Sequence, residues 1–360
     1  MQFYSLPLVA RLGLTSGLLL LAACEKDTDT RASVVLPTAV KFDQTGLYPE
    51  GTQYDDQQAR FLVGSQTAGR ISQIRDNGQN DRDQDGKELP YATGAYATFT
   101  DDPVLISSIG LKLDVPRGRL LVAVSDPGYN TTRTSAATKD KLARLVVFDR
   151  SSGTKIDFQD LSALAGLPTA YPNHFANDIA IDNQGSAYVT DSYAPIIYKV
   201  TFNSLGVGTA AIFLNNSALA APSGKFGLNG IVYHPNGYLL VAKSDEGTLI
   251  KVPVNNPNAF TKVTLPTGLD LSNDDGLQLT ANTTLLAVCN AQGKVYQLTS
   301  TDDFVSVTSP KSFDTSGGYP TTLARRADNT SYVLQSHLDA LQAKQSPAVS
   351  AYALKKVVFQ

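Results

Sequence analysis

The chain has 360 residues, of which 42% are apolar and 18% are charged, and its formal net charge is −3. This near-neutral balance, without any cluster of Lys and Arg, excludes the basic surface that nucleic-acid-binding proteins use. Of its two cysteines, Cys24 belongs to the leader described next, so Cys289 alone can form neither an internal disulfide nor a cysteine-based metal cluster. Cys289 ends a strand-like run that begins at Leu285, which predicts a buried structural thiol.

The first two dozen residues predict an exported lipoprotein. A short segment with a basic tip precedes an apolar run that is shorter than the roughly 20 residues of a stable membrane span. Leu21-Ala22-Ala23-Cys24 resembles a bacterial lipobox, which implies that residues 1–23 are removed and that Cys24 is acylated. Acyl chains would then anchor a soluble protein through their buried CH₂ groups. The alternative is an ordinary secretory signal with an incidental cysteine.

Residues 24–36 are expected to form a polar tether, because they are mostly hydrophilic and lack any apolar periodicity. The mature protein is therefore expected at the bacterial cell envelope, on the periplasmic or the cell-surface side, with the lipid as its only contact with the membrane. Residues 37–360 are assigned to one domain, which we expect to be a monomer. A strand near residues 34–42 is expected to close that domain against its last repeat.

Short β-branched and aromatic runs fill the rest of the chain, separated by Gly, Asn, Asp and Pro, which is typical of all-β proteins. Residues 177–189 align with residues 229–241: each segment has a polar first residue, an alternating strand, a Gly turn at +8 and a second strand near +12. The same template fits four more segments. The six first residues are Glu50, Ile109, Asn177, Asn229, Asp275 and Thr321.

These six first residues are separated by 59, 68, 52, 46 and 46 positions. Hairpin repeats of about 40–50 residues indicate the blades of a β-propeller. The two longest separations are explained by inserted loops near residues 76–103 and 127–143. The sequence therefore predicts an all-β fold, a six-bladed β-propeller with four-stranded blades.

Four of the six first residues carry oxygen ligands. The first strand of each blade lines the central channel of a propeller, so we expect Glu50, Asn177, Asn229 and Asp275 to meet near one mouth of that channel. Two carboxylates and two carboxamides suit a hard divalent cation, Ca²⁺ above all. Without a cation, two carboxylates in a narrow channel would be costly. The alternative is that Asn and Asp only begin strands as turn residues.

The motifs around these residues resemble the metal site of the SMP-30/gluconolactonase family, whose superfamily of calcium-dependent six-bladed propellers includes paraoxonases and phosphotriesterases. The likeness is carried by Pro-Glu-Gly at Glu50, Asn-Asp-Ile at Asn177, Asn-Gly-Ile at Asn229 and Asp-Gly-Leu at Asp275. It implies that these four residues bind the metal and that Asp275 is also the general base. The family's substrate-recognising arginine and lid loop have no match here.

The ends of the second strands are expected to form an outer ring at the same mouth. There Asp191 and Asp245 either orient the ligand asparagines or bind substrate hydroxyls, and the alternative is that they are turn residues. His174 and His337 are candidate substrate-pocket residues, with a structural role as the alternative for His174. His234 lies at the far hairpin and is expected to be solvated.

Residues 81–88 resemble the first half of a calcium loop, but the twelfth EF-hand position is Ala92, so a solvated acidic loop is the alternative. Gly-rich phosphate loops, nucleophile elbows and zinc-spaced His/Cys clusters are absent from the sequence. The leading hypothesis is thus a Ca²⁺-dependent hydrolase of lactones or related esters that acts on a small molecule. The rival is a calcium-stabilised propeller that binds a ligand or partner without catalysis. The hydrolase predicts an open mouth, and the binding protein predicts a plugged or shallow one.

Overall fold

The structure is a computed structural model that describes residues 36–75, 96–165 and 171–359. The predicted signal peptide, Cys24 and nearly all of the tether lie outside the described residues, as does the acidic segment 81–88. Among the helices that the structure describes, none is both long enough and apolar enough to cross a membrane.

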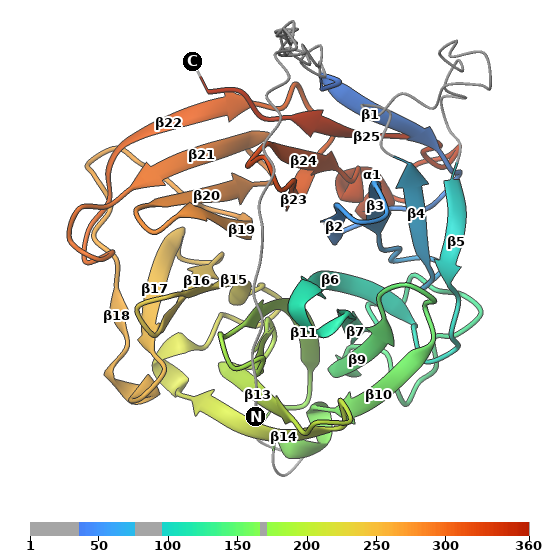
Figure 1. Ribbon diagram of the computed structural model, residues 1–360, viewed down its shortest axis with the longest axis horizontal. Coiled ribbons are helices and arrows are strands. Elements are labelled where there is room, and N and C mark those ends of the chain that lie inside the picture. The colour runs from blue at the N-terminus through green and yellow to red at the C-terminus, as the bar shows by residue number, and fades with distance from the viewer. Residues whose placement is uncertain (1–35, 76–95, 166–170, 360) are drawn as a thin grey trace, which may run out of the picture. The chain divides into compact units, whose positions relative to one another are not determined.

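The described residues from Leu36 onward form six antiparallel sheets arranged around a central axis (Figure 1). This confirms the predicted six-bladed β-propeller. We number the blades by their first strands. Blade 1 contains β2 (Thr52–Asp55), β3 (Arg60–Val63), β4 (Ile71–Arg75) and β5 (Tyr96–Thr100); blade 2 contains β6 (Ser107–Asp114), β7 (Arg119–Ser125), β9 (Arg144–Asp149) and β10 (Lys155–Asp160); blade 3 contains β11 (His174–Ile181), β12 (Ala187–Asp191), β13 (Ile196–Phe202) and β14 (Gly208–Asn215), with β8 (Lys141–Leu142) parallel to β11.

The second half of the ring repeats this order, and short helices lie in the connections. Blade 4 contains β15 (Leu228–His234), β16 (Tyr238–Lys243), β17 (Thr248–Pro253) and β18 (Thr261–Lys262); blade 5 contains β19 (Asp274–Ala281), β20 (Thr284–Cys289), β21 (Lys294–Thr299) and β22 (Thr308–Asp314); blade 6 contains β23 (Pro320–Arg325), β24 (Ser331–Gln335), β25 (Ala351–Lys356) and β1 (Ala39–Asp43). The helices are η1 (Val115–Arg117), η2 (Ser162–Leu164), η3 (Ser217–Leu219), η4 (Pro257–Ala259) and α1 (Leu338–Gln342).

Strand β1 closes the ring as predicted. It pairs antiparallel with β25, from Ala39 opposite Lys355 to Asp43 opposite Ala351, and so supplies the outer strand of blade 6. Phe42 on β1 is fully buried and stacks on Tyr352 of β25 with ring centroids 5.7 Å apart. Apolar contact therefore supports the backbone ladder where the two ends of the fold meet.

Replacing Phe42 by alanine is expected to lower the free energy of unfolding by about 3–5 kcal/mol, because the closing strand would lose a buried aromatic side chain and leave a cavity. Urea denaturation followed by circular dichroism would measure this loss. Phe158→Ala on the outer strand β10 is the matched control, since Phe158 is 38% exposed and should cost much less. Equal losses in the two variants would contradict the closing role of β1.

Glycines that directly follow several of the six first residues allow the first strands to approach one another closely around the axis. A Cβ at Gly51 would overlap the carbonyl oxygen of Ile109, one at Gly110 that of Asn177, and one at Gly230 that of Asp275. The first residues of neighbouring repeats therefore crowd around a channel too narrow for another side chain at these positions. These glycines are thus part of what places the predicted ligands near the axis.

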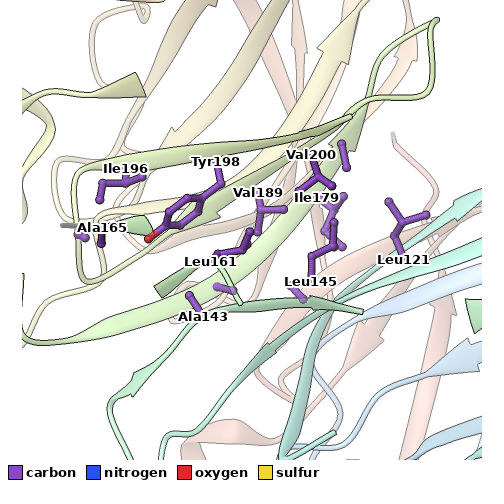
Figure 2. Packing of buried hydrophobic residues seen from close by; sticks show 14 of the residues in the cluster. Leu121, Ala143, Leu145, Leu161, Ala165, Ile179, Val189, Ile196, Tyr198 and Val200 are labelled. Atoms are coloured by element: carbon purple, nitrogen blue, oxygen red, sulfur yellow. The ribbon is translucent and has the colours of Figure 1, made fainter. Parts of the chain in front are cut away.

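Most of the hydrophobic core lies between neighbouring blades. Figure 2 shows one such layer, in which Leu121 and Leu145 of blade 2 face Ile179, Val189 and Tyr198 of blade 3. Alternating residues on each strand supply this layer, as the period-2 pattern of the sequence predicts. The stacked sheets act as a rigid support for the loops and strand ends at either mouth of the channel.

Two single-residue predictions can be compared with this core. Cys289 is fully buried, as predicted, and burial raises the pKa of its thiol. The prediction that His234 is solvated is wrong, because only 1% of this residue is exposed. Its ring stacks on Tyr238 at 4.4 Å, and its Nε2 lies 2.7 Å from the carbonyl oxygen of Asn282, so the far hairpin packs against the neighbouring blade.

Candidate metal centre

The structure brings the four predicted oxygen ligands together. Glu50, Asn177, Asn229 and Asp275 line the same narrow cavity on the axis, together with Ile109, and all four have 4–7% of their surface exposed. We call these four residues the oxygen ring. The sixth first residue does not join them, because the hydroxyl of Thr321 donates to the carbonyl oxygen of Glu50 at 2.8 Å.

β-Bulges aim three of these side chains, those of Asn177, Asn229 and Asp275, toward the axis. The ladder between the first and second strands shifts register between Ala176 and Ile179 in blade 3, between Leu228 and Ile231 in blade 4, and between Asp274 and Leu277 in blade 5. Each shift leaves the ring residue and the residue after it outside the regular ladder. A bulge turns a side chain out of the alternating pattern of a strand, and such bulges are frequent beside functional sites.

Two serines orient the two asparagines of the ring. The Nδ2 of Asn177 donates to Ser192 Oγ at 3.0 Å, and the Nδ2 of Asn229 donates to Ser244 Oγ at 3.1 Å. Each serine hydroxyl in turn donates to a backbone carbonyl of the next blade, that of Leu228 or that of Asp274. Because the amide nitrogens are held in this way, the two Oδ1 atoms are in position to coordinate a cation.

A carboxamide from outside the ring donates to each of its carboxylates. Gln66 Nε2 donates to Glu50 Oε2 at 2.6 Å, and Asn290 Nδ2 donates to Asp275 Oδ2 at 3.2 Å. Burial, followed by the negative charge of Asp275, raises the pKa of Glu50 well above its usual range. Burial, followed by the charge of Asp178, raises the pKa of Asp275 to about 7. Among the described residues, no Lys or Arg side chain contributes to either pKa shift.

The ring fits a hard divalent cation. Its donors are two carboxylates and two carboxamide oxygens, and the buried Oδ1 of Asn229 has no hydrogen-bond partner among the described residues. A buried polar atom without a partner is rare and calls for an explanation. The described residues hold no cluster of three His, Cys, Asp or Glu side chains, so this mixed set of oxygen donors is the candidate. Such a set is chemically suited to Ca²⁺.

Replacing Ser244 by alanine is expected to weaken Ca²⁺ affinity about 10–100-fold, since the Asn229 amide would lose the partner that orients it. Ser125→Ala is a matched control. The Ser125 hydroxyl also donates to a carbonyl of the next blade, that of Ala176 at 3.0 Å, but the first residue of its blade is Ile109. Calorimetric titration of both variants with Ca²⁺ measures the effect. An equal loss in the control would show that the serines only hold neighbouring blades together.

Of the two predicted outer-ring aspartates, one lines the cavity above the oxygen ring and the other does not. Asp245 lines the cavity above the ring and pairs with the buried Lys243. Asp191 is fully buried and does not line that cavity; it accepts hydrogen bonds from the Tyr198 hydroxyl at 3.0 Å and from the backbone N–H of Phe175 at 2.9 Å. Its role in this structure is to hold the strand ends of blade 3.

The two candidate histidines are also outside the wall of this cavity. His174 is 6% exposed, and its Nδ1 lies 2.7 Å from Asp191 Oδ2. His337 precedes α1 and meets Tyr352 edge-on at 5.9 Å, and burial lowers its pKa. The structure thus places Asp245 alone of the four predicted pocket residues beside the ring.

Above the oxygen ring the channel widens into a cavity of about 410 Å³, which we call the ring cavity. Its walls carry aromatic side chains that no sequence pattern predicted: Tyr129, Phe175, Tyr193, Phe226 and Tyr319. The Tyr193 and Phe226 rings stack at 5.1 Å, and Lys225 is the lysine in this wall. These residues come mainly from loops, where a repeat template contains no information.

No protein-family model matches the chain, and no curated protein matches it in sequence. Solved structures do resemble it. The major allergen Mala s 1 of Malassezia sympodialis is similar with a TM-score of 0.67 at 16% identity, over 89% of this chain and 96% of that one. The calcium-binding protein regucalcin of Agrobacterium tumefaciens is similar with a TM-score of 0.55 at 15% identity, over 89% and 95%.

A gluconolactonase candidate is similar with a TM-score of 0.53 at 14% identity, over 90% of this chain and 94% of that one. At these identities the likeness concerns the fold, and it covers nearly the whole of each neighbour. The chain is therefore a six-bladed β-propeller similar in architecture to regucalcin and to gluconolactonase-like proteins.

Proposed function

We propose that this protein is a Ca²⁺-dependent hydrolase of lactones or related esters. The observation that carries the proposal is the oxygen ring, in which two buried carboxylates and two serine-oriented carboxamides meet on the axis. The ring forms the floor of a cavity of about 410 Å³, within the range of small-molecule sites. The resemblance to regucalcin and to a gluconolactonase candidate supports this choice of chemistry.

Each group of residues has a distinct task in the proposed reaction. A bound divalent cation supplies polarisation of the substrate carbonyl and a lower pKa for a neighbouring water. Glu50, Asn177, Asn229 and Asp275 would hold that cation, and the Asp275 carboxylate would also take the proton of the attacking water. The aromatic wall of the ring cavity positions the substrate and excludes bulk water.

A small substrate panel tests the proposal. Purified full-length protein would be assayed on aliphatic lactones, aryl esters and phosphotriesters, with Ca²⁺ and with a chelator. Turnover of lactones or aryl esters that is lost on chelation and restored by Ca²⁺ is expected. Folded, Ca²⁺-loaded protein without turnover on the whole panel would favour the rival function, a non-catalytic binding propeller. The wide ring cavity supports the hydrolase, because the rival predicts a plugged or shallow mouth.

We also propose that the enzyme acts at the bacterial cell envelope, anchored through a lipid on Cys24. Replacing Cys24 by serine is expected to abolish incorporation of labelled palmitate and to release the protein from the membrane fraction. Cys289→Ala is the control, because this thiol is buried in blade 5 and should not affect labelling. Undiminished palmitate labelling of the Cys24 variant would contradict the anchor.

A further inference from the structure

The channel has a second wide cavity on the side of the ring away from the ring cavity. Its walls include residues of the first strands. Lys112 lies three positions after Ile109 in blade 2, and Arg325 lies four positions after Thr321 in blade 6. Asp178 and Thr322 line both this cavity and the narrow one at the ring, which places the three cavities in order along the axis. We call it the far cavity; at about 530 Å³ it is larger than the ring cavity.

Two cations face the far cavity without a carboxylate in contact. Among the described residues, the ammonium group of Lys112 forms no hydrogen bond and no ion pair. Burial lowers the pKa of its ammonium group, and the charge of Arg325 adds to this effect. Arg325 donates through Nη1 to the carbonyl oxygens of Leu279 at 2.8 Å and Thr280 at 3.3 Å, and no described carboxylate pairs with its guanidinium group.

The carboxylates in the same wall are already engaged by backbone donors. Asp178 Oδ1 accepts from the backbone N–H of Ile179 at 2.8 Å, and Asp178 Oδ2 accepts from that of Ile231 at 3.1 Å, which ties blade 3 to blade 4. Asp56 Oδ1 accepts from the backbone N–H of Ala327 at 2.9 Å. The charge of Asp178 raises the pKa of Lys112 only from beyond ion-pair distance. Lys112 is half-buried, and an ammonium group that is partly removed from water without a contacting counter-ion is poorly neutralised.

Apolar surface lies beside these charges. Leu279, Tyr233 and Leu323 line the far cavity with Lys112 and Arg325. A ligand that fits must therefore present a negative head group to the two cations and an apolar body to the leucines and the tyrosine. The planar guanidinium group of Arg325 suits the oxygens of a carboxylate or a phosphate, and Lys112 adds a point charge.

We propose that the far cavity is a binding site for a small organic anion whose carboxylate or phosphate group contacts Lys112 and Arg325. This site is separate from the oxygen ring and does not depend on the hydrolase activity proposed above. In this arrangement the anion supplies the counter-charge that the protein itself does not place against Lys112.

Calorimetric titration of the full-length protein with benzoate and with phenyl phosphate tests the site, in chelator so that the ring cannot bind the probes through a metal. At least one of the two probes is expected to bind, and comparison of the two assigns the head group. Benzamide, which has the shape of benzoate but no charge, is expected not to bind. Wild-type protein that binds neither anion would overturn the proposal.

Variants assign the binding to the far cavity. Lys112→Met and Arg325→Gln are each expected to lower the affinity for the probe about tenfold or more, because each removes a charge-assisted contact. Lys225→Met is the matched control, because Lys225 lines the ring cavity instead, and it should bind the probe like wild type. Arg325 is exposed, so its variant tests the site even where Lys112→Met fails to fold. Binding that is lost in the control and kept in both far-cavity variants would overturn the proposal.

Discussion

Replacing Asp275 by asparagine is expected to reduce kcat for lactone hydrolysis by about 10²–10⁴-fold, the usual effect of losing a general base. The substitution keeps the shape of the side chain and its oxygen donor but removes the charge. It also leaves the ring with one carboxylate, so Ca²⁺ affinity should fall. Steady-state kinetics at saturating Ca²⁺ separates the two effects, because the loss of kcat should persist when the metal site is full.

Asp140→Asn is the matched control for this variant. Asp140 is another carboxylate in the wall of the ring cavity, and its backbone has φ 58°, a conformation that asparagine adopts readily. We expect this variant to keep Ca²⁺ affinity and kcat close to those of wild type. If the two variants lost activity equally, the general charge of the cavity would matter and Asp275 would have no special role as base.

Removing Ca²⁺ is expected to make the stability of the protein fall as pH rises. Burial and Asp178 raise the pKa of Asp275 from its ordinary value of 3.8 to about 7 in the folded, metal-free protein. The folded state then holds a proton that the unfolded state has lost, so stability is full below about pH 4, decreases up to about pH 7 and is level above. The whole range corresponds to about 4 kcal/mol.

Thermal unfolding in chelator measures this effect. Between pH 5 and pH 8 we expect Tm to fall by about 5 °C or more, and added Ca²⁺ should remove most of the decrease by neutralising the ring. In the same chelator, Asp275→Asn should be more stable than wild type at pH 8, because it carries no charge to bury. A Tm of wild type that is independent of both pH and Ca²⁺ would contradict a cation site at the ring.

Most of the fold could be predicted from the sequence repeat. Its template records a Gly turn between two alternating strands, and both features are local, so six copies predict six hairpins and hence six blades. The closing strand was also predictable, because an apolar segment before the first repeat has a fixed place in such a ring. His234 was mispredicted because part of its environment, Asn282 and Phe304, comes from another blade, and such contacts leave no local pattern.

The ring residues could be proposed from sequence because each occupies the same position of the repeat. The serines that orient Asn177 and Asn229 recur 15 residues after them, at Ser192 and Ser244, and this spacing was available in the sequence. The residues predicted to orient the asparagines were instead the neighbouring Asp191 and Asp245. The bulges explain the difference, because they shift the register between the first and second strands and so change which residue faces the asparagine.

The pairing of β1 with β25 sets the order in which the protein can reach its final state. Tyr48, just after β1, donates its backbone N–H to the hydroxyl of Tyr352, and these residues are 304 positions apart along the chain. Blade 6 cannot be completed before both of these distant segments are present, and contacts of such long range form slowly. During synthesis, the edge of β1 that pairs with β25 must wait unpaired while the other five blades emerge. Under the export proposed above, the ring would close only after β25, its last strand, has crossed the membrane.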